Sequence, residues 1–480
     1  MRKIATVFIS LLLVLSALAA CSSGNSSSSS GSNAGTGSNT GSGSGGSSAS
    51  SSSTASGGAE AGPLEQWGAS VKAELDGTTI TALLASHDAT TAMQQMIDEF
   101  TGLTGIKVNT KVLASTEMKT MQRSNSSTKT GVFDIYMVDA FTIYEYAKNG
   151  WLENLQGYLD DPALTPEWYD YEDILPAFRE GIATVEGQAY ALPIAGESRF
   201  IAYRKDLFEK HNIQVPKTLD ELLEVAKYFK NSDENVAGIV FRGAAGTLVG
   251  SAHMALAYAF TDDPIYNHVT GQFQVNSPET IQSIEYILEL AKYGPDDIAS
   301  YNHEDAVALF MQGKSAMWFD ATSMAFQIED PSASTVAGNV GYFNVPDGPA
   351  GGSGAIAGWS LGIPTDSENK KAAYAFAMFM SSREKAKDYI QKGGIPSRTS
   401  SFEDAELTAA KPLNQYVFEA IKDAGRLVDR GVTYNYASPH VLSFMKIIGD
   451  QINRAMIGEI TAEQAANNAQ KEIENVLASS

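Results

Sequence analysis

The sequence predicts an α/β fold that is divided between two lobes. Three apolar segments, residues 78–84, 106–113 and 132–138, have the length of strands and are separated by helical segments. The order strand, helix, strand, helix, strand is typical of a parallel sheet. The folded part runs from about residue 63 to residue 480, and a single core stops growing at about 250–300 residues. We therefore expect two lobes.

Short polar signals mark where helices and turns begin. Thr218 stands three residues before Glu221, and Thr461 stands three residues before Gln464. This spacing is typical of a capping box, in which the two side chains satisfy the free N–H groups of a helix start. Residues 185–193 are expected to form a hairpin around a Glu-Gly turn.

The first 62 residues are predicted to serve export and attachment. Residues 1–20 have a positively charged start and a short apolar run, which is typical of a signal peptide. The run ends in Leu-Ala-Ala before Cys21, and this order resembles the lipobox of bacterial lipoproteins. The resemblance implies that Cys21 is lipidated; a plain signal peptide is the alternative. Residues 21–62 then form a disordered Ser/Gly linker, whose length suits a Gram-positive cell wall.

Composition and spacing argue against several functions. The net charge of −22 argues against nucleic acid as a partner, and the single cysteine allows no internal disulfide and no thiolate metal cluster. The six histidines include no His-Glu-x-x-His motif, and no Gly-x-x-x-x-Gly-Lys-Ser/Thr loop is present. We expect no catalytic residue, no metal and no cofactor. A glycoside hydrolase is the enzymatic alternative, because acidic residues are abundant.

An ordered set of short motifs resembles one protein family. The motifs are 187–193 (GQAYALP), 203–208 (YRKDLF), 215–221 (VPKTLDE), 310–317 (FMQGKSAM) and 393–398 (GGIPSR). Together they resemble the extracellular solute-binding proteins of ABC importers, family 1 type. The Gly-Glu-Ser segment at 196–198 looks like that of the sorbitol- and mannitol-type members among the sugar and polyol binders.

The resemblance implies a periplasmic-binding-protein-like fold, often called a Venus flytrap. Each lobe would be a mostly parallel sheet flanked by helices, and hinge strands would cross between the lobes. The expected N-lobe comprises residues 63–192 plus 319–357, and the expected C-lobe comprises residues 193–318 plus 358–480. The hinge crossings would fall near residues 192–193, 318–319 and 358–359.

The resemblance also implies a function. The protein would capture a carbohydrate (a sugar, an oligosaccharide or a polyol) outside the membrane and deliver it to the permease subunits of an ABC transporter. It would act as a monomer, held to the outer face of the cell membrane by its lipid alone. A binder of another solute, such as a polyamine, and a sensory co-receptor are the alternatives.

The expected solute decides which residues could bind it. Sugars and polyols need polar side chains for their hydroxyls and aromatic rings for their C–H faces. Such residues follow the first and third strands and flank the expected hinges. The predicted ligand-binding residues are His87, Asp88, Asp139, Glu197, Arg199, Trp318, Asp320, Trp359 and Arg398. Tyr434 and Tyr436 are further candidates.

Several of these residues have a structural alternative. Asp88 and Asp139 stand where they could cap the helices that follow them. Trp318 and Trp359 could belong to the hydrophobic core, and Arg398 could form a salt bridge.

Overall fold

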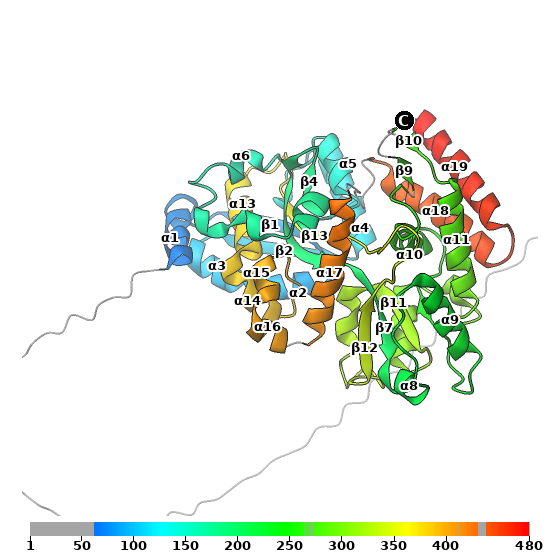
Figure 1. The fold of residues 1–480 in the computed structure, drawn as a ribbon. Helices are drawn as coiled ribbons and strands as arrows, with labels where there is room; N and C mark the ends of the chain where they lie inside the picture. The colour runs from blue at the N-terminus through cyan, green and yellow to red at the C-terminus, as the bar shows by residue number, and fades with distance from the viewer. Residues whose placement is uncertain are drawn as a thin grey trace, which may run out of the picture. The chain divides into compact units, whose positions relative to one another are not determined.

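The computed structural model describes residues 62–263, 265–267, 270, 272–410, 412–430 and 438–479. The predicted signal peptide, Cys21 and the linker up to residue 61 lie outside this part of the chain, as do Tyr434 and Tyr436. The described residues belong to one compact unit, whose helices and strands are drawn in Figure 1. No helix within these residues is long and apolar enough to span a bilayer.

The first sheet has five strands in the order β2-β1-β3-β13-β6. Its strands are β1 (Thr79–Ala85), β2 (Lys107–Leu113), β3 (Ile135–Asp139), β6 (Ala191–Glu197) and β13 (Ala357–Gly362). The three strands predicted from apolar segments are confirmed, and β1 runs parallel to both β2 and β3. β13 runs antiparallel to β3 and β6. The carboxyl ends of β1 and β3 therefore lie at the same edge of the sheet.

The second sheet has four strands in the order β12-β7-β11-β8. Its strands are β7 (Arg199–Arg204), β8 (Val240–Phe241), β11 (Met317–Ala321) and β12 (Val340–Asn344). β7 is antiparallel to both of its neighbours, and β11 is parallel to β8. Both sheets are thus mixed, with fewer parallel pairs than the predicted mostly parallel sheets.

Two strand-to-strand links of the described residues pass from one sheet to the other. Ser198 links β6 to β7, and residues 345–356 link β12 to β13. The predicted crossings at residues 192–193, 318–319 and 358–359 lie instead within β6, β11 and β13, because each of those segments is paired along its length in one sheet.

These pairings bear on the predicted lobe limits, which otherwise remain a prediction. β13 pairs with β3 and β6, which favours placing residues 357–362 with the first lobe. β12 pairs with β7, which favours placing residues 340–344 with the second lobe.

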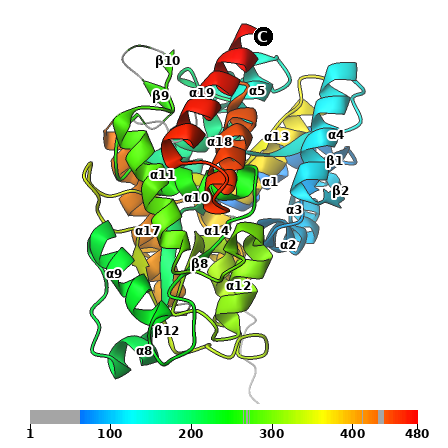
Figure 2. The same ribbon diagram turned by 90° about the vertical axis from the view of Figure 1, so that its right-hand side faces the viewer.

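Helices cover both sheets. Those that pack with the first sheet or with one another beside it are α1 (Pro63–Leu75), α2 (Asp88–Gln94), α3 (Ile97–Thr104), α4 (Ser115–Thr128), α5 (Ile143–Lys148), α6 (Gln156–Leu159), α7 (Pro176–Phe178), α13 (Lys370–Ser381), α14 (Arg383–Gln391), α15 (Thr399–Glu403) and α16 (Ala405–Ala410). Those that pack with the second sheet, or with one another next to it (Figure 2), are α8 (Lys205–Lys210), α9 (Leu219–Lys230), α10 (Thr247–Ala257), α11 (Pro278–Ala291), α12 (His303–Met311), α18 (Val441–Met456) and α19 (Ala462–Ala478).

The predicted helix starts and hairpin can be compared directly with the structure. α19 begins with the complete capping box of Thr461 and Gln464. At α9, Thr218 accepts the N–H of Glu221, but the Glu221 carboxylate accepts the N–H of Lys217 instead of closing the box. The hairpin is confirmed: β4 (Thr184–Val185) and β5 (Gln188–Ala189) are antiparallel around a two-residue turn with positive φ angles.

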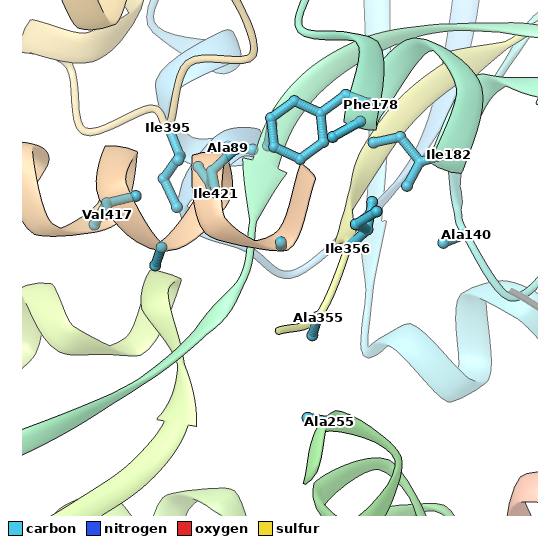
Figure 3. Close-up of a cluster of buried hydrophobic side chains, with 14 of the residues drawn as sticks. Ala89, Ala140, Phe178, Ile182, Ala255, Ala355, Ile356, Ile395, Val417 and Ile421 are labelled. Atoms are coloured by element: carbon cyan, nitrogen blue, oxygen red, sulfur yellow. The ribbon is translucent and has the colours of Figure 1, made fainter. Parts of the chain in front are cut away.

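One helix contacts elements of both sheets. α17 (Leu413–Asp429) packs against α7 and β6 and also against β7 and β12. Figure 3 shows Ile421 of α17 beside Ile395, with Phe178 and Ile356 in the same buried cluster. Ile356 belongs to the second linker between the sheets. The cluster therefore packs one of the crossings against a helix that both sheets share.

Candidate ligand-binding site

A cavity of about 340 Å³ lies where the two sheets meet. It is lined by residues at the carboxyl ends of β1, β3, β6 and β11, at the start of β13, and on the linker residue Ser198. Ligands of α/β sheets bind beyond the carboxyl ends of strands, where loops leave room and backbone groups are free. The cavity therefore occupies the place where the fold class predicts a binding site.

Five of the nine predicted ligand-binding residues line this cavity. They are His87, Asp139, Glu197, Arg199 and Trp359. His87 and Asp139 follow predicted strands, which is the signal that selected them in the sequence. Glu197, Arg199 and Trp359 were selected from the family resemblance and their places beside the expected hinges. The residues that sequence reasoning missed include Arg242, Ser251, His303 and Ser323.

Asp88 and Arg398 lie outside the cavity lining. Asp88 is exposed in the first turn of α2, whose N-cap is His87. Arg398 is 2% exposed, and its guanidinium donates to the backbone oxygens of Tyr169, Asp170 and Ser381. The structural alternative for Arg398, a salt bridge, is also present, at 3.3 Å from Asp173. Arg398 thus has a structural role: it links the backbone at residues 169–170 to the end of α13.

Trp318 and Asp320 also lie outside the lining. They belong to β11, an inner strand of the second sheet, and both side chains are fully buried. Trp318 is part of the hydrophobic core. Asp320 is within reach of the cavity only through the arginines that it pairs with.

Glu197 connects groups from both sheets. Its Oε1 lies 2.9 Å from Nε2 of His87, which follows β1, and its Oε2 accepts a hydrogen bond from Ser323, which follows β11. Nδ1 of His87 accepts the N–H of Ala89, so the ring proton sits on Nε2 and faces Glu197. Burial alone would raise the pKa of Glu197, but His87 and Ser323 hold that pKa below its usual value. Glu197 is therefore ionised.

Asp139 both caps a turn and lines the cavity. Its Oδ1 accepts from the N–H groups of Phe141 and Thr142, which is the capping role given as its alternative. Its Oδ2 lies 2.5 Å from Nζ of Lys119. The same Nζ stands 5.9 Å from the ring centre of Trp359, so cation, carboxylate and indole form one group at the cavity wall.

Two arginines approach from the second sheet. Arg199 donates to Asp320 at 3.0 Å and to Ser251 at 3.0 Å. Arg242 donates through Nε to the other oxygen of Asp320 at 2.9 Å and through Nη2 to the first. Burial alone would raise the pKa of Asp320, but the charges of Arg242 and Arg199 hold it below the usual value. Asp320 is thus an ionised support for both arginines.

Three buried polar atoms on cavity-lining residues accept or donate no hydrogen bond by strict geometry among the described residues: Oε1 of Glu197, Oγ of Ser198 and Nδ1 of His303. Oε1 of Glu197 faces the imidazole of His87 at 2.9 Å, so the two atoms without any polar partner in that part of the chain are those of Ser198 and His303. Buried polar groups in folded proteins are nearly always satisfied, by protein, water or ligand. The one sequence feature that marks His303 is its position at the start of a helix, directly after the N-cap residue Asn302 of α12.

The charges around the cavity balance within the described residues. The side chains that line it, with their buried ion-pair partners, include three cations and three carboxylates: Lys119, Arg199, Arg242, Asp139, Glu197 and Asp320. The wall is therefore polar but carries no net charge when both histidines are neutral. Among the described residues, no three His, Asp or Glu side chains are grouped so that they could hold a metal ion.

Comparison with curated proteins finds relatives that are named for polyols. The mannitol-binding protein of Pseudomonas aeruginosa is 28% identical over 380 residues, which are 75% of this chain and 84% of that protein. The erythritol/L-threitol-binding protein of Mycolicibacterium smegmatis is 26% identical over 369 residues, which are 73% of this chain and 77% of that protein.

Comparison with solved structures also finds proteins that hold polyols. A solute-binding protein of an ABC transporter from Agrobacterium radiobacter K84, in complex with ribitol, matches with a TM-score of 0.75 at 25% identity over 84% of this chain and 99% of that chain. One from Agrobacterium vitis S4 with bound D-mannitol matches with a TM-score of 0.71 at 27% identity and the same coverage. Residues 85–387, more than half of the chain, match the model of one family. The chain therefore belongs to the bacterial extracellular solute-binding proteins.

Proposed function

We propose that this protein captures an acyclic polyol or a small sugar in the cavity between its sheets and delivers it to an ABC importer. The observation that carries the proposal is the composition of the cavity wall. Trp359 offers an apolar face, while Glu197, Asp139 and the two arginines offer charged hydrogen-bonding groups around it. Relatives named for mannitol and erythritol, and structures holding ribitol and mannitol, support the same solute class.

The size of the cavity favours a small solute. Ligand pockets usually measure about 300–1,000 Å³. At about 340 Å³, this cavity lies at the lower end of that range. A polyol or a monosaccharide therefore fits the space better than an oligosaccharide does.

The charge balance of the wall favours a neutral solute. Every carboxylate at the cavity already faces a cation or an imidazole N–H at 3.0 Å or less. A polyamine would need uncompensated carboxylates, because burying a cation without a counter-charge is costly. The polyamine alternative is therefore disfavoured, and charge-assisted hydrogen bonds to hydroxyls are favoured.

We also propose how the protein reaches its transporter. Cys21 would carry the lipid after cleavage behind Ala20, and residues 22–62 would let the folded part move at the outer face of the membrane. The protein would act as a monomer, without catalysis and without a cofactor, and would dock on two permease subunits. A sensory role remains the second candidate; neighbouring genes for permease subunits would favour transport.

The proposal is tested by calorimetry and thermal unfolding with D-mannitol, ribitol, erythritol, maltose and spermidine. A solute that binds only the folded state raises its apparent stability, so one of the three polyols is expected to raise the melting temperature most. Cleavage of maltose would favour the glycoside hydrolase alternative. Stabilisation by spermidine alone would overturn the proposal.

Variants at the wall make the site assignment testable. Trp359→Ala and Glu197→Ala are each expected to weaken binding of that polyol at least tenfold, which corresponds to about 1.4 kcal/mol. Stability without the polyol should change little for Trp359→Ala, because this side chain is only partly buried. Trp168→Ala is the matched control, since that indole is also partly buried and lies outside the cavity. Equal affinity in all three variants would contradict the site.

A further inference from the structure

The two unpartnered atoms at the cavity suggest how the solute is recognised. Ser198 is 1% exposed, and its backbone N–H and C=O are bonded to Thr322, so only its hydroxyl remains without a partner. Nδ1 of His303, on the first turn of α12, is also buried. Both residues line the cavity. A polar atom that is buried and unsatisfied in the free protein is ready to bond to a ligand.

The neighbours of His303 decide which form its ring takes. Nε2 lies 2.8 Å from a carboxylate oxygen of Glu304. An ionised carboxylate can only accept, so the ring proton sits on Nε2 and Nδ1 presents a lone pair. Burial and the nearby charge of Arg242 lower the pKa of His303, which keeps the ring neutral. His303 therefore offers an acceptor to the cavity.

The proposed function and these two atoms lead to one inference. We propose that Nδ1 of His303 accepts a hydrogen bond from one solute hydroxyl and that Oγ of Ser198 bonds to another. His303 is then a specificity-determining residue: it selects a solute that presents a hydroxyl donor at that position. A site built to bond a hydroxyl discriminates against an analogue that lacks it, because its own polar atom is left unpaired.

The inference rests on the proposed function, so the test begins with the full-length protein and D-mannitol. The affinities of wild type and of His303→Leu are measured for D-mannitol and for its monodeoxyfluoro analogues, in which fluorine replaces one hydroxyl and cannot donate. For wild type, we expect at least one analogue to bind about 10- to 100-fold more weakly. His303→Leu should bind D-mannitol more weakly by a similar factor.

The combination of variant and analogue separates a direct hydrogen bond from a general loss of structure. For His303→Leu, the analogue that wild type discriminates against should bind no more weakly than D-mannitol, because the two changes remove the same bond. His303→Asn should recover part of the affinity, since its side-chain oxygen can take the place of Nδ1. His211→Leu is the control: both ring nitrogens of His211 contact Glu234 and Tyr228 outside the cavity, so its affinity should equal that of wild type.

Two results would overturn the inference. One is a His303→Leu protein with wild-type affinity for D-mannitol. The other is additivity: the loss of affinity caused by His303→Leu and the loss caused by fluorine in the analogue add in full when the two are combined. If His303→Leu does not fold, as thermal unfolding would show, the comparison of His303→Asn with wild type over the same analogues decides the question. Failure of the proposed function would look different, because wild type itself would then bind none of D-mannitol, ribitol, erythritol and maltose.

Discussion

Asp320 is the buried carboxylate on which both cavity arginines depend. It is fully buried in β11 and receives hydrogen bonds from Arg199 and Arg242. Without that negative charge, two guanidinium groups would stand close together in a poorly hydrated place. Asp320 therefore acts on the solute through the arginines that it positions.

This role predicts the effect of Asp320→Asn. The variant is expected to lose about 3–5 kcal/mol of unfolding free energy, because one partner of a buried charge cluster loses its charge. Its affinity for the polyol should fall at least tenfold, because the arginines at the wall lose their support. Thermal unfolding and calorimetry measure the two effects separately.

A matched control comes from the exposed pair of Asp206 and Arg204. The Asp206 side chain also accepts from one guanidinium through two hydrogen bonds but is 42% exposed. Asp206→Asn is expected to change the unfolding free energy by at most about 1 kcal/mol and to leave affinity unchanged. If Asp320→Asn behaved like this control, the positioning role would be wrong.

The sequence allowed some of the cavity residues to be predicted and not others. Glu197 and Trp359 were predicted because they lie beside hinges that the family resemblance implies; Glu197 ends β6, and Trp359 is the third residue of β13. Arg242 and His303 were missed because they follow a two-residue strand and a helix cap, signals that are common outside binding sites. Trp318 was predicted at the site because a hinge was expected there; β11 is instead an inner strand of the second sheet, and a single sequence does not reveal which strands pair.

At the scale of elements, α10 shows how a buried histidine limits stability in acid. His253 on α10 is fully buried, and its Nε2 lies 2.8 Å from Oγ of Ser283 on α11. That hydroxyl donates to the carbonyl of Thr280, so it can only accept from the ring. Burial lowers the pKa of His253 from 6.5 to about 4. The helix pair is therefore built around a neutral imidazole.

The lowered pKa predicts a loss of stability in acid. Between pH 6.5 and about 4 the unfolded chain binds a proton at His253 and the folded chain does not, so stability falls as pH falls. The full difference corresponds to about 3 kcal/mol. His253→Gln keeps a donor for Ser283 and does not titrate, so its unfolding free energy should fall less over this range. Denaturant unfolding at a series of pH values checks this, and parallel curves for both proteins would contradict it.

The elements also show where sequence patterns stop being informative. β1, β2 and β3 were predictable because the length and the apolar pattern of each segment depend only on residues that are neighbours in the chain. The crossings between the sheets were misplaced because a crossing is defined by which strands pair, and pairing joins residues far apart in the chain. Ser198, for example, is identified as a linker only by the different partners of β6 and β7.

At the scale of the whole molecule, the solute would contact groups from both sheets at once. His87 follows β1 and Trp359 lies in β13, both of the first sheet. Arg242 follows β8 of the second sheet, and His303 lies on α12, which packs against β8 and β11. A ligand shifts a conformational equilibrium only through contacts that differ between the states. Contacts on both sides of the cavity would favour a state in which the sheets close on the solute; Ser198 and residues 345–356 are the strand-to-strand links that such a movement would involve.

The proposed lipid on Cys21 predicts a clean separation of attachment from binding. Cys21→Ser removes the only thiol of the chain and, with it, the site of acylation. The variant is expected to leave the membrane fraction in cells that process lipoproteins, because this chain has no other proposed anchor and acyl chains supply the membrane affinity. Its affinity for the polyol should equal that of wild type, since Cys21 stands far before Ser86, the first residue of the chain that lines the cavity. Ser22→Ala, one residue further on, is the control and should stay with the membrane. Fractionation followed by calorimetry checks both statements, and a Cys21→Ser protein that remained membrane-bound would show that the anchor lies elsewhere.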